Sequence, residues 1–277
     1  KIIDSDYNSL EPCCFSSVTG DEGLQAIFKN GWDFYSTIAI KTEKLDEDKK
    51  TYPNGVSPDK KAPNFLKKLD PSKRNKAKAY SLGIPYGMSA FALGKTLGIS
   101  TKEADVLVNG YLNGFPKLKE WLENSREFVK KNGYIKNYVG RIRHLPEAKF
   151  LYERFGDSLL DWNAKKALEP IYGKELVLSM SRDYKNQLNN CLNYQLQSLA
   201  ATIVNRAAVK INRKAKELGI DAIVQAQVHD QLIINVREDQ AEMFAPIVQD
   251  IMENNLKIPG VDLVAPPQIA DNFRDGH

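Results

Sequence analysis

The sequence KRNKAKAYSLGIPYG, residues 73–87, is the stretch around which we expect the chain to be organised. It follows Asp70 and Pro71, whose residue types favour the cap and the first position of a helix. Because a step of four residues turns by only about 40° around a helix, every fourth side chain falls on one slowly winding stripe. That stripe consists of Arg74, Lys78, Leu82 and Tyr86. Two cations followed by an apolar and an aromatic side chain are suited to hold a nucleoside triphosphate lengthwise.

A stretch rich in Lys and Arg is also typical of an ordinary solvent-exposed helix. The ending Pro85-Tyr86-Gly87 argues against that interpretation, because a plain surface helix has no need of it. Pro85 lacks an N–H and predicts that the helix kinks or ends there. A hinge at this point would suit an element that closes over a substrate.

Composition describes an ordinary globular protein of 277 residues, with 42% hydrophobic residues and a net charge of +4. Positive charge is concentrated at residues 59–78, which hold eight Lys or Arg and two Asp. The three cysteines, Cys13, Cys14 and Cys191, match neither a disulfide framework nor a metal-ligand spacing. We therefore expect a reducing compartment and, since no apolar run of about 18 residues is present, no transmembrane helix.

The order of elements predicts an α+β fold, with strands near both ends of the chain and helices in the middle. Strands are expected at residues 2–7, 134–139, 222–228, 232–236 and 261–265. Helices are expected at residues 21–29, 32–40, 90–97, 182–218 and 238–255, and over 100–133 with a break near 114–116. Residues 41–63 read as a loop, and residues 151–172 receive no assignment.

Two carboxylates are candidates for chemistry. Asp6 ends the first strand, and Asp230 lies in the tight turn between the strands at 222–228 and 232–236. Asp is a common turn former, so either residue alone is unremarkable. If the strands pair, however, the two carboxylates converge at one sheet edge, where their repulsion calls for a cation. Mg²⁺ prefers such oxygen ligands, and two ions about 4 Å apart can activate a hydroxyl and stabilise a leaving pyrophosphate.

These segments resemble, in order, the conserved motifs of the family A DNA polymerases, the class of bacterial DNA polymerase I. Residues 4–11, DSDYNSLE, resemble motif A; residues 73–87 resemble the nucleotide-binding fingers helix; and residues 229–230 resemble motif C. Residues 140–146 are similar to a Gly-Arg-rich segment ending in Leu-Pro, and residues 271–277 are similar to the family's C-terminus.

The resemblance implies that Asp6, Asp230 and Lys78 are catalytic. Asp6 and Asp230 would bind two Mg²⁺ ions, for which Mn²⁺ can substitute, with the Tyr7 carbonyl as a further ligand. Lys78 would act as the general acid for the leaving pyrophosphate. The nucleotide-binding residues implied are Arg74, Lys78, Leu82, Tyr86, Glu11 and Tyr35. The primer- and template-binding residues implied are His229, Gln197, Asn193, Arg143 and Gly87.

The chain departs from the family pattern at four of these positions or their neighbours. Leu82 replaces an aromatic ring, which predicts weaker nucleotide binding. Gln231 replaces the Glu that usually follows motif C, and we expect a changed metal or pH preference rather than lost activity. Tyr35 stands where a phosphate-contacting His is frequent, and Asn189 stands where an Arg is common.

The expected function is template-directed DNA synthesis by two-metal nucleotidyl transfer, with primer-template DNA and dNTPs as partners. The resemblance also implies a cytoplasmic, nucleoid-associated protein of a bacterial or phage-infected cell. An RNA-synthesising relative is disfavoured by Glu11, which with Tyr86 would leave no room for a 2′-hydroxyl. A non-catalytic nucleic-acid-binding subunit is disfavoured because it has no use for a carboxylate cluster.

The resemblance divides the chain into a palm at residues 1–20 and 191–277 and an inserted fingers subdomain at 21–190. Motif A comes almost at once, leaving no room here for a thumb or an exonuclease-like domain. An N-terminal portion or a second polypeptide is expected to supply them.

Overall fold

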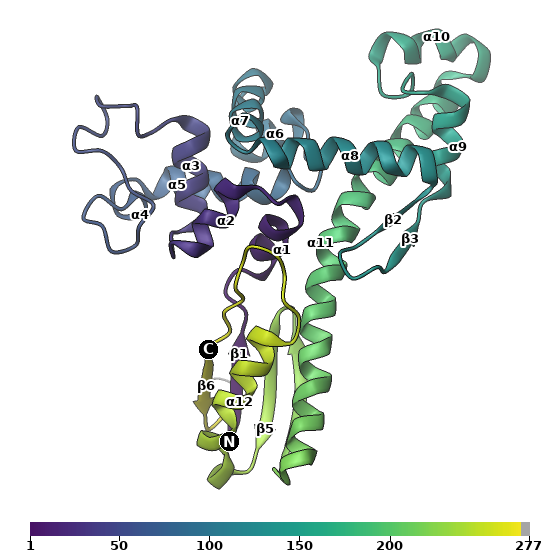
Figure 1. Cartoon of the computed structure of the whole chain (residues 1–277). Coiled ribbons are helices and arrows are strands. Elements are labelled where there is room, and N and C mark those ends of the chain that lie inside the picture. The colour runs from purple at the N-terminus through teal and green to yellow at the C-terminus, as the bar shows by residue number, and fades with distance from the viewer. Residues whose placement is uncertain (273–277) are drawn as a thin grey trace. The chain divides into compact units, whose positions relative to one another are not determined.

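The computed structural model describes residues 1–272 and divides into two compact units (Figure 1). The first unit contains Lys1–Val18 and the chain from Leu196 onward, and the second contains Thr19–Gln195. The boundary between Gln195 and Leu196 falls within one long helix, α11 (Lys174–Leu218), so that helix contributes residues to both units. The C-terminal motif expected at residues 271–277 lies mostly outside the described residues.

The first unit is built on a four-stranded antiparallel sheet with the order β4-β5-β1-β6. Its strands are β1 (Ile2–Asp6), β4 (Ala222–Val228), β5 (Gln231–Val236) and β6 (Pro267–Ala270). Both ends of the described chain thus meet in one sheet, as the α+β prediction requires. The strand expected at residues 261–265 is wrong: Val261, Leu263 and Ala265 alternate in burial, but β6 forms the sheet edge instead. Alternating burial there reflects an extended segment packed on the core rather than a strand in the ladder.

Helices complete the first unit. These are α1 (Leu10–Thr19), the short η1 (Glu238–Gln240) and α12 (Ala241–Asn254), which contacts β1 and β6 (Figure 1). Apolar side chains of α12 and the strands are fully buried between them, including Ile3, Ile234, Phe244 and Val248. The C-terminal part of α11 is tied to β4, because the Val224 N–H donates to Asn212 Oδ1 at 2.8 Å.

The second unit is mostly helical. Its helices before the break near residue 115 are α2 (Glu22–Lys29), α3 (Phe34–Glu43), α4 (Leu66–Leu69), α5 (Pro71–Gly83), α6 (Ala90–Leu97) and α7 (Thr101–Gly114). The elements after it are α8 (Pro116–Asn132), β2 (Tyr134–Lys136), β3 (Ile142–His144), α9 (Pro146–Phe155) and α10 (Trp162–Tyr172). Ser100 and Glu103 form a capping box at the start of α7, and Pro116 opens α8 at the predicted break.

Two expectations for this unit are wrong, and one stretch without an assignment is now described. The strand predicted at 134–139 stops at Lys136, because the Asn137 side chain accepts the N–H groups of Val139 and Arg141 in a turn. Residues 151–172, left unassigned, belong largely to α9 and α10. Finally, α11 begins at Lys174, eight residues before the predicted start at 182.

The core of the second unit positions α5. Tyr80 and Tyr111 are fully buried with ring centroids 6.0 Å apart, and Phe115 extends the cluster. The Tyr111 hydroxyl donates to the Ser81 carbonyl at 3.0 Å, which fastens α7 to α5. Ala77, Tyr80 and Ser81 are buried and fix α5 to the core, and the predicted stripe begins beside this buried face. Within residues 1–272, none of the helices has the length and apolar character needed to cross a membrane.

Candidate active site

The first unit brings the two candidate carboxylates to one end of neighbouring strands. Asp6 lies opposite Gln231 in the β1–β5 register, and Asp230 is the residue just before Gln231. A two-residue turn, His229-Asp230, joins β4 to β5, because Val228 pairs with Gln231. His229 has a φ of 55°, a left-handed conformation in which His is enriched among non-glycine residues. Asp6 and His229 are exposed and Asp230 is half-buried, so this sheet edge is open to a ligand.

Tyr7 anchors the chain directly after Asp6. Its hydroxyl donates to the Met252 carbonyl at 2.7 Å and accepts from the Asn255 amide at 3.2 Å. Burial raises the pKa of Tyr7 far above its ordinary value, so the phenol stays neutral. Because the side chain is committed to the core, the atom that Tyr7 can offer to a cation is its backbone carbonyl oxygen.

A second acidic residue on β1 lies beneath this edge. Asp4 is 4% exposed, and its two carboxylate oxygens lie 2.7 and 2.8 Å from the side-chain amide nitrogen of Gln231, which is 5% exposed. The Gln231 amide therefore donates hydrogen bonds to Asp4. Gln231, which replaces the family's Glu, thus has a specific partner in this chain. Sequence reasoning missed this contact, because the two residues are 227 positions apart.

No group of three or more His, Cys, Asp or Glu side chains in residues 1–272 is arranged to hold a metal ion. The groups available where β1 and β5 meet the turn are the carboxylates of Asp6 and Asp230 and the backbone carbonyl of Tyr7. That set fits Mg²⁺, which usually takes one or two carboxylates and completes its shell with water and substrate phosphates. Glu11, a further candidate, is half-buried in the first turn of α1.

The predicted stripe lies on α5 and the turn that follows it. Asp70 caps the helix by accepting the Lys73 N–H at 3.2 Å, and Pro71 takes the first helical position. The helix ends at Gly83, before Pro85, as predicted, but the Tyr86 N–H still reaches the Leu82 carbonyl at 3.4 Å. The half-buried Arg74, the exposed Lys78, and the half-buried Leu82 and Tyr86 therefore form one continuous series.

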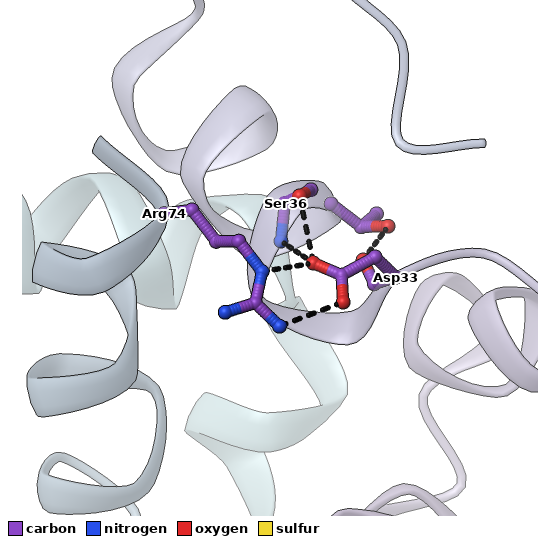
Figure 2. A network of polar contacts seen from close by, with 4 residues as sticks. Asp33, Ser36 and Arg74 are labelled. Atoms are coloured by element: carbon purple, nitrogen blue, oxygen red, sulfur yellow. Dashed lines mark hydrogen bonds and ion pairs between the residues drawn. The ribbon is translucent and has the colours of Figure 1, made fainter. Parts of the chain in front are cut away.

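Arg74 is held by Asp33, a residue that sequence reasoning did not single out (Figure 2). Arg74 Nε donates to Asp33 Oδ1 at 2.8 Å, and Nη2 donates to Oδ2 at 2.9 Å. Asp33 Oδ1 also accepts from the backbone N–H and the hydroxyl of Ser36, at 2.9 and 2.7 Å, which caps α3. Burial alone would raise the pKa of Asp33, but the hydrogen bonds from Arg74 and Ser36 outweigh it and lower that pKa. The hydrogen bonds that the guanidinium donates to Asp33 in turn raise the pKa of Arg74.

Tyr35 supports both cations of the stripe. The Arg74 guanidinium carbon lies 5.2 Å from the centroid of its ring, and Lys78 Nζ lies 5.5 Å from the same centroid. Both distances are within the range of cation–π attraction. The structure thus gives Tyr35 a contact with both cations through its ring face.

Gly87 is constrained by its own backbone and by Asn189. Its φ is +85°, and a Cβ placed there would lie 2.1 Å from Asn189 Oδ1. Asn189 also lies 3.4 Å from Arg126 Nη2, whose guanidinium has a pKa lowered by burial. Asn189, where the family often has Arg, therefore lies next to another Arg of this chain, the half-buried Arg126.

The remaining predicted nucleic-acid contacts are dispersed. Arg143 is exposed on β3, and Gln197 is exposed on α11 within the first unit. Asn193 lies one turn earlier on α11, in the second unit, and its buried Oδ1 has no hydrogen-bond partner within the described protein. The structure therefore groups the metal candidates in one unit and the triphosphate candidates in the other.

Comparisons with known proteins agree over nearly the whole chain. A thermostable DNA polymerase I of Thermus filiformis is 29% identical over 253 residues, which are 91% of this chain and 24% of that protein. DNA polymerase I of Pseudomonas aeruginosa is 26% identical over 277 residues, covering 100% of this chain and 25% of that protein. The chain thus spans about a quarter of the length of these curated relatives.

A solved structure shares the fold. The POL domain of Pol1 from M. smegmatis, in a complex with DNA primer-template and dNTP, matches 99% of this chain and 40% of that chain. Its TM-score is 0.75 and its sequence identity is 24%. The model of the family described as DNA polymerase family A matches residues 1–275. The chain therefore belongs to DNA polymerase family A.

Proposed function

We propose that this chain carries the part of a DNA polymerase that adds deoxynucleotides to a primer 3′ end under the direction of a template, releasing pyrophosphate. The observation that carries the proposal is the pairing of β1 with β5, which sets Asp6 and Asp230 at one sheet edge in a member of this family. The DNA polymerase I relatives support the same reaction. Their bacterial sources support a cytoplasmic location.

The first unit is assigned the metal ions. Asp6 and Asp230 would hold two Mg²⁺ or Mn²⁺ ions, with the Tyr7 carbonyl as a further ligand. When bound, such a pair of ions supplies charge stabilisation for the attacking and leaving oxygens of a phosphoryl transfer. The core contacts of Tyr7 support this assignment, because they hold the backbone rigid directly after Asp6. Glu11 is proposed to exclude ribonucleotides by leaving no room for their 2′-hydroxyl.

The second unit is assigned the triphosphate. Arg74 and Lys78 offer the phosphates two cations, one a planar guanidinium that can bind two oxygens, and Tyr35 supports both. Lys78 is exposed and can donate a proton to the leaving pyrophosphate. Leu82 and Tyr86 follow on the same stripe and are proposed to contact the base and sugar of the nucleotide.

The partners proposed are primer-template DNA and dNTPs, the components of the complex solved for the M. smegmatis domain. The residues assigned to primer and template are His229, Gln197, Asn193, Arg143 and Gly87. Because the chain covers about a quarter of its curated relatives, an N-terminal portion or a second polypeptide is proposed to supply the remaining contacts.

Primer extension tests the proposal. The chain, alone and with a preceding polymerase portion added, is given a primed template, Mg²⁺ and either dNTPs or rNTPs. We expect extension with dNTPs only, and a loss of about 100-fold or more in rate for Asp230→Asn, since a metal site contributes several kcal/mol. Asp250→Asn, an exposed acid on α12, is the matched control. Extension that survives Asp230→Asn, or none in either format, would overturn the proposal.

A further inference from the structure

The ion pair between Arg74 and Asp33 uses only one edge of the guanidinium. A guanidinium has five N–H donors, and Asp33 takes one from Nε and one from Nη2. Figure 2 shows that the third nitrogen points away from Asp33 and has no dashed contact to the residues drawn. Among residues 1–272, Asp33 is the carboxylate that pairs with Arg74. The Nη1 edge therefore faces away from Asp33, while the Nε–Nη2 edge is fixed by it.

Asp33 is itself immobilised. Its Oδ1 accepts from the Ser36 N–H and hydroxyl while also accepting from Arg74, so rotation of the carboxylate would break contacts on two elements. The backbone is held as well, since the Thr37 hydroxyl donates to the Asp33 carbonyl at 2.9 Å. The Arg74 and Asp33 side chains are only 13% and 11% exposed. A long, flexible Arg side chain is thereby restricted to one orientation before any ligand arrives.

We propose that Asp33 is a positioning residue for nucleotide binding: it holds the Arg74 guanidinium by its Nε–Nη2 edge so that the Nη1 edge meets the triphosphate. The inference rests on the proposed function, because it takes Arg74 as a phosphate ligand. Its physical basis is preorganisation, since restricting the side chain in advance reduces the entropy lost on binding. The Tyr35 ring, 5.2 Å from the guanidinium carbon, limits motion further.

Two other roles for Asp33 make different predictions. If Asp33 only caps α3, removing its charge leaves nucleotide binding unchanged. If it competes with phosphate for Arg74, removing its charge tightens nucleotide binding. Asp33→Asn separates these roles, because Asn caps helices as well as Asp does but loses the charge that holds the guanidinium. Asp161→Asn is the matched control, since Asp161 caps α10 through the Ala164 N–H at 2.8 Å and no salt bridge is recorded for it among residues 1–272.

The experiment measures dNTP KM and kcat in primer extension, and the Kd of inorganic tripolyphosphate by calorimetry. For Asp33→Asn we expect a roughly 10-fold rise in both KM and Kd, with kcat changed by no more than about 3-fold. Asp161→Asn is expected to match the wild type. In an Arg74→Ala background, Asp33→Asn is expected to have no further effect on either constant, because Asp33 acts through Arg74.

A KM and Kd that stay the same or fall in Asp33→Asn would overturn the inference, as would an equal effect in the Arg74→Ala background. Asp33→Ser, which also keeps a capping oxygen, provides a second variant should Asp33→Asn fold poorly. The tripolyphosphate titration distinguishes failure of the proposed function from failure of the inference about Asp33. If the wild type extends no primer, the proposed function fails, while the Kd values still decide whether Asp33 positions Arg74.

Discussion

Replacing Gln231 with Glu, the residue usual in the family, is expected to destabilise this chain rather than improve it. The new carboxylate oxygen would stand where the amide nitrogen now lies, 2.7 and 2.8 Å from the two oxygens of Asp4. Both side chains are at most 5% exposed. Two charges about 4 Å apart repel by about 4 kcal/mol at an effective dielectric constant of 20. Protonating a Glu of ordinary pKa at pH 7 costs about 4 kcal/mol as well, so either route predicts a loss of that size.

The loss should depend on pH in a defined direction. Because the folded variant favours the protonated acid, the folded-state pKa of Glu at this position lies above its unfolded value. Stability is then greatest at low pH and falls as pH rises through the interval between the two values. Urea unfolding followed by circular dichroism at pH 5 and pH 7 measures this, with wild type as the reference at each pH.

A reciprocal variant controls for packing. Asp4→Asn combined with Gln231→Glu exchanges the donor and the acceptor, and is expected to recover most of the lost free energy of unfolding. A Gln231→Glu chain within about 1 kcal/mol of wild type at pH 7 would refute the reasoning, because the buried contact would then carry little energy. So would a loss of equal size at both pH values.

Three further results are expected. Leu82→Phe should lower the KM for dNTP by roughly 2- to 10-fold, because an aromatic face adds stacking, and an unchanged KM would count against that role. Gly87→Ala should lower the melting temperature, since its Cβ would lie 2.1 Å from Asn189 Oδ1 at a φ of +85°; a melting curve like that of the wild type would show that this contact is not close in solution. Burial raises the pKa of the Cys13 and Cys191 thiols to about 12, so at pH 8 they should react with a thiol reagent only after denaturation, and rapid labelling of the native chain would contradict their burial.

Local signals made much of the fold predictable. The cap at Asp70, the capping box at Ser100 and the break at Pro116 each depend on residues within one helical turn, and each is found in the structure. The sequence of α10 does not reveal which of its residues are buried: Trp162 and Ile171 are 64% and 72% exposed, whereas Lys165 is buried. Periodicity identifies an apolar face but not whether the fold covers it.

The candidate site was predictable in its parts but not in its contacts. The proximity of Asp6 and Asp230 could be predicted, because the sequence indicates a hairpin around Asp230 and a first strand, containing Asp6, that can pair with it. The pairing of Asp33 with Arg74 spans 41 positions, and nothing in the type of either residue identifies its partner. Asp33 has a local signal, since it precedes a helix, but that signal predicts a cap and stops there.

The positions that depart from the family pattern therefore need to be judged by their neighbours rather than one at a time. Considered alone, Gln231 is a position where the family's acidic Glu has been lost. In the structure, however, its uncharged amide donates hydrogen bonds to the buried Asp4, which a Glu carboxylate could not do. Considered alone, Tyr35 is a position where the family's frequent His has been lost. In the structure, however, its ring lies beside two cations, Arg74 and Lys78. In both cases the substituted side chain has a specific partner. For Gln231, restoring the family residue alone should accordingly cost stability, and the lost stability should return only when Asp4 is changed with it.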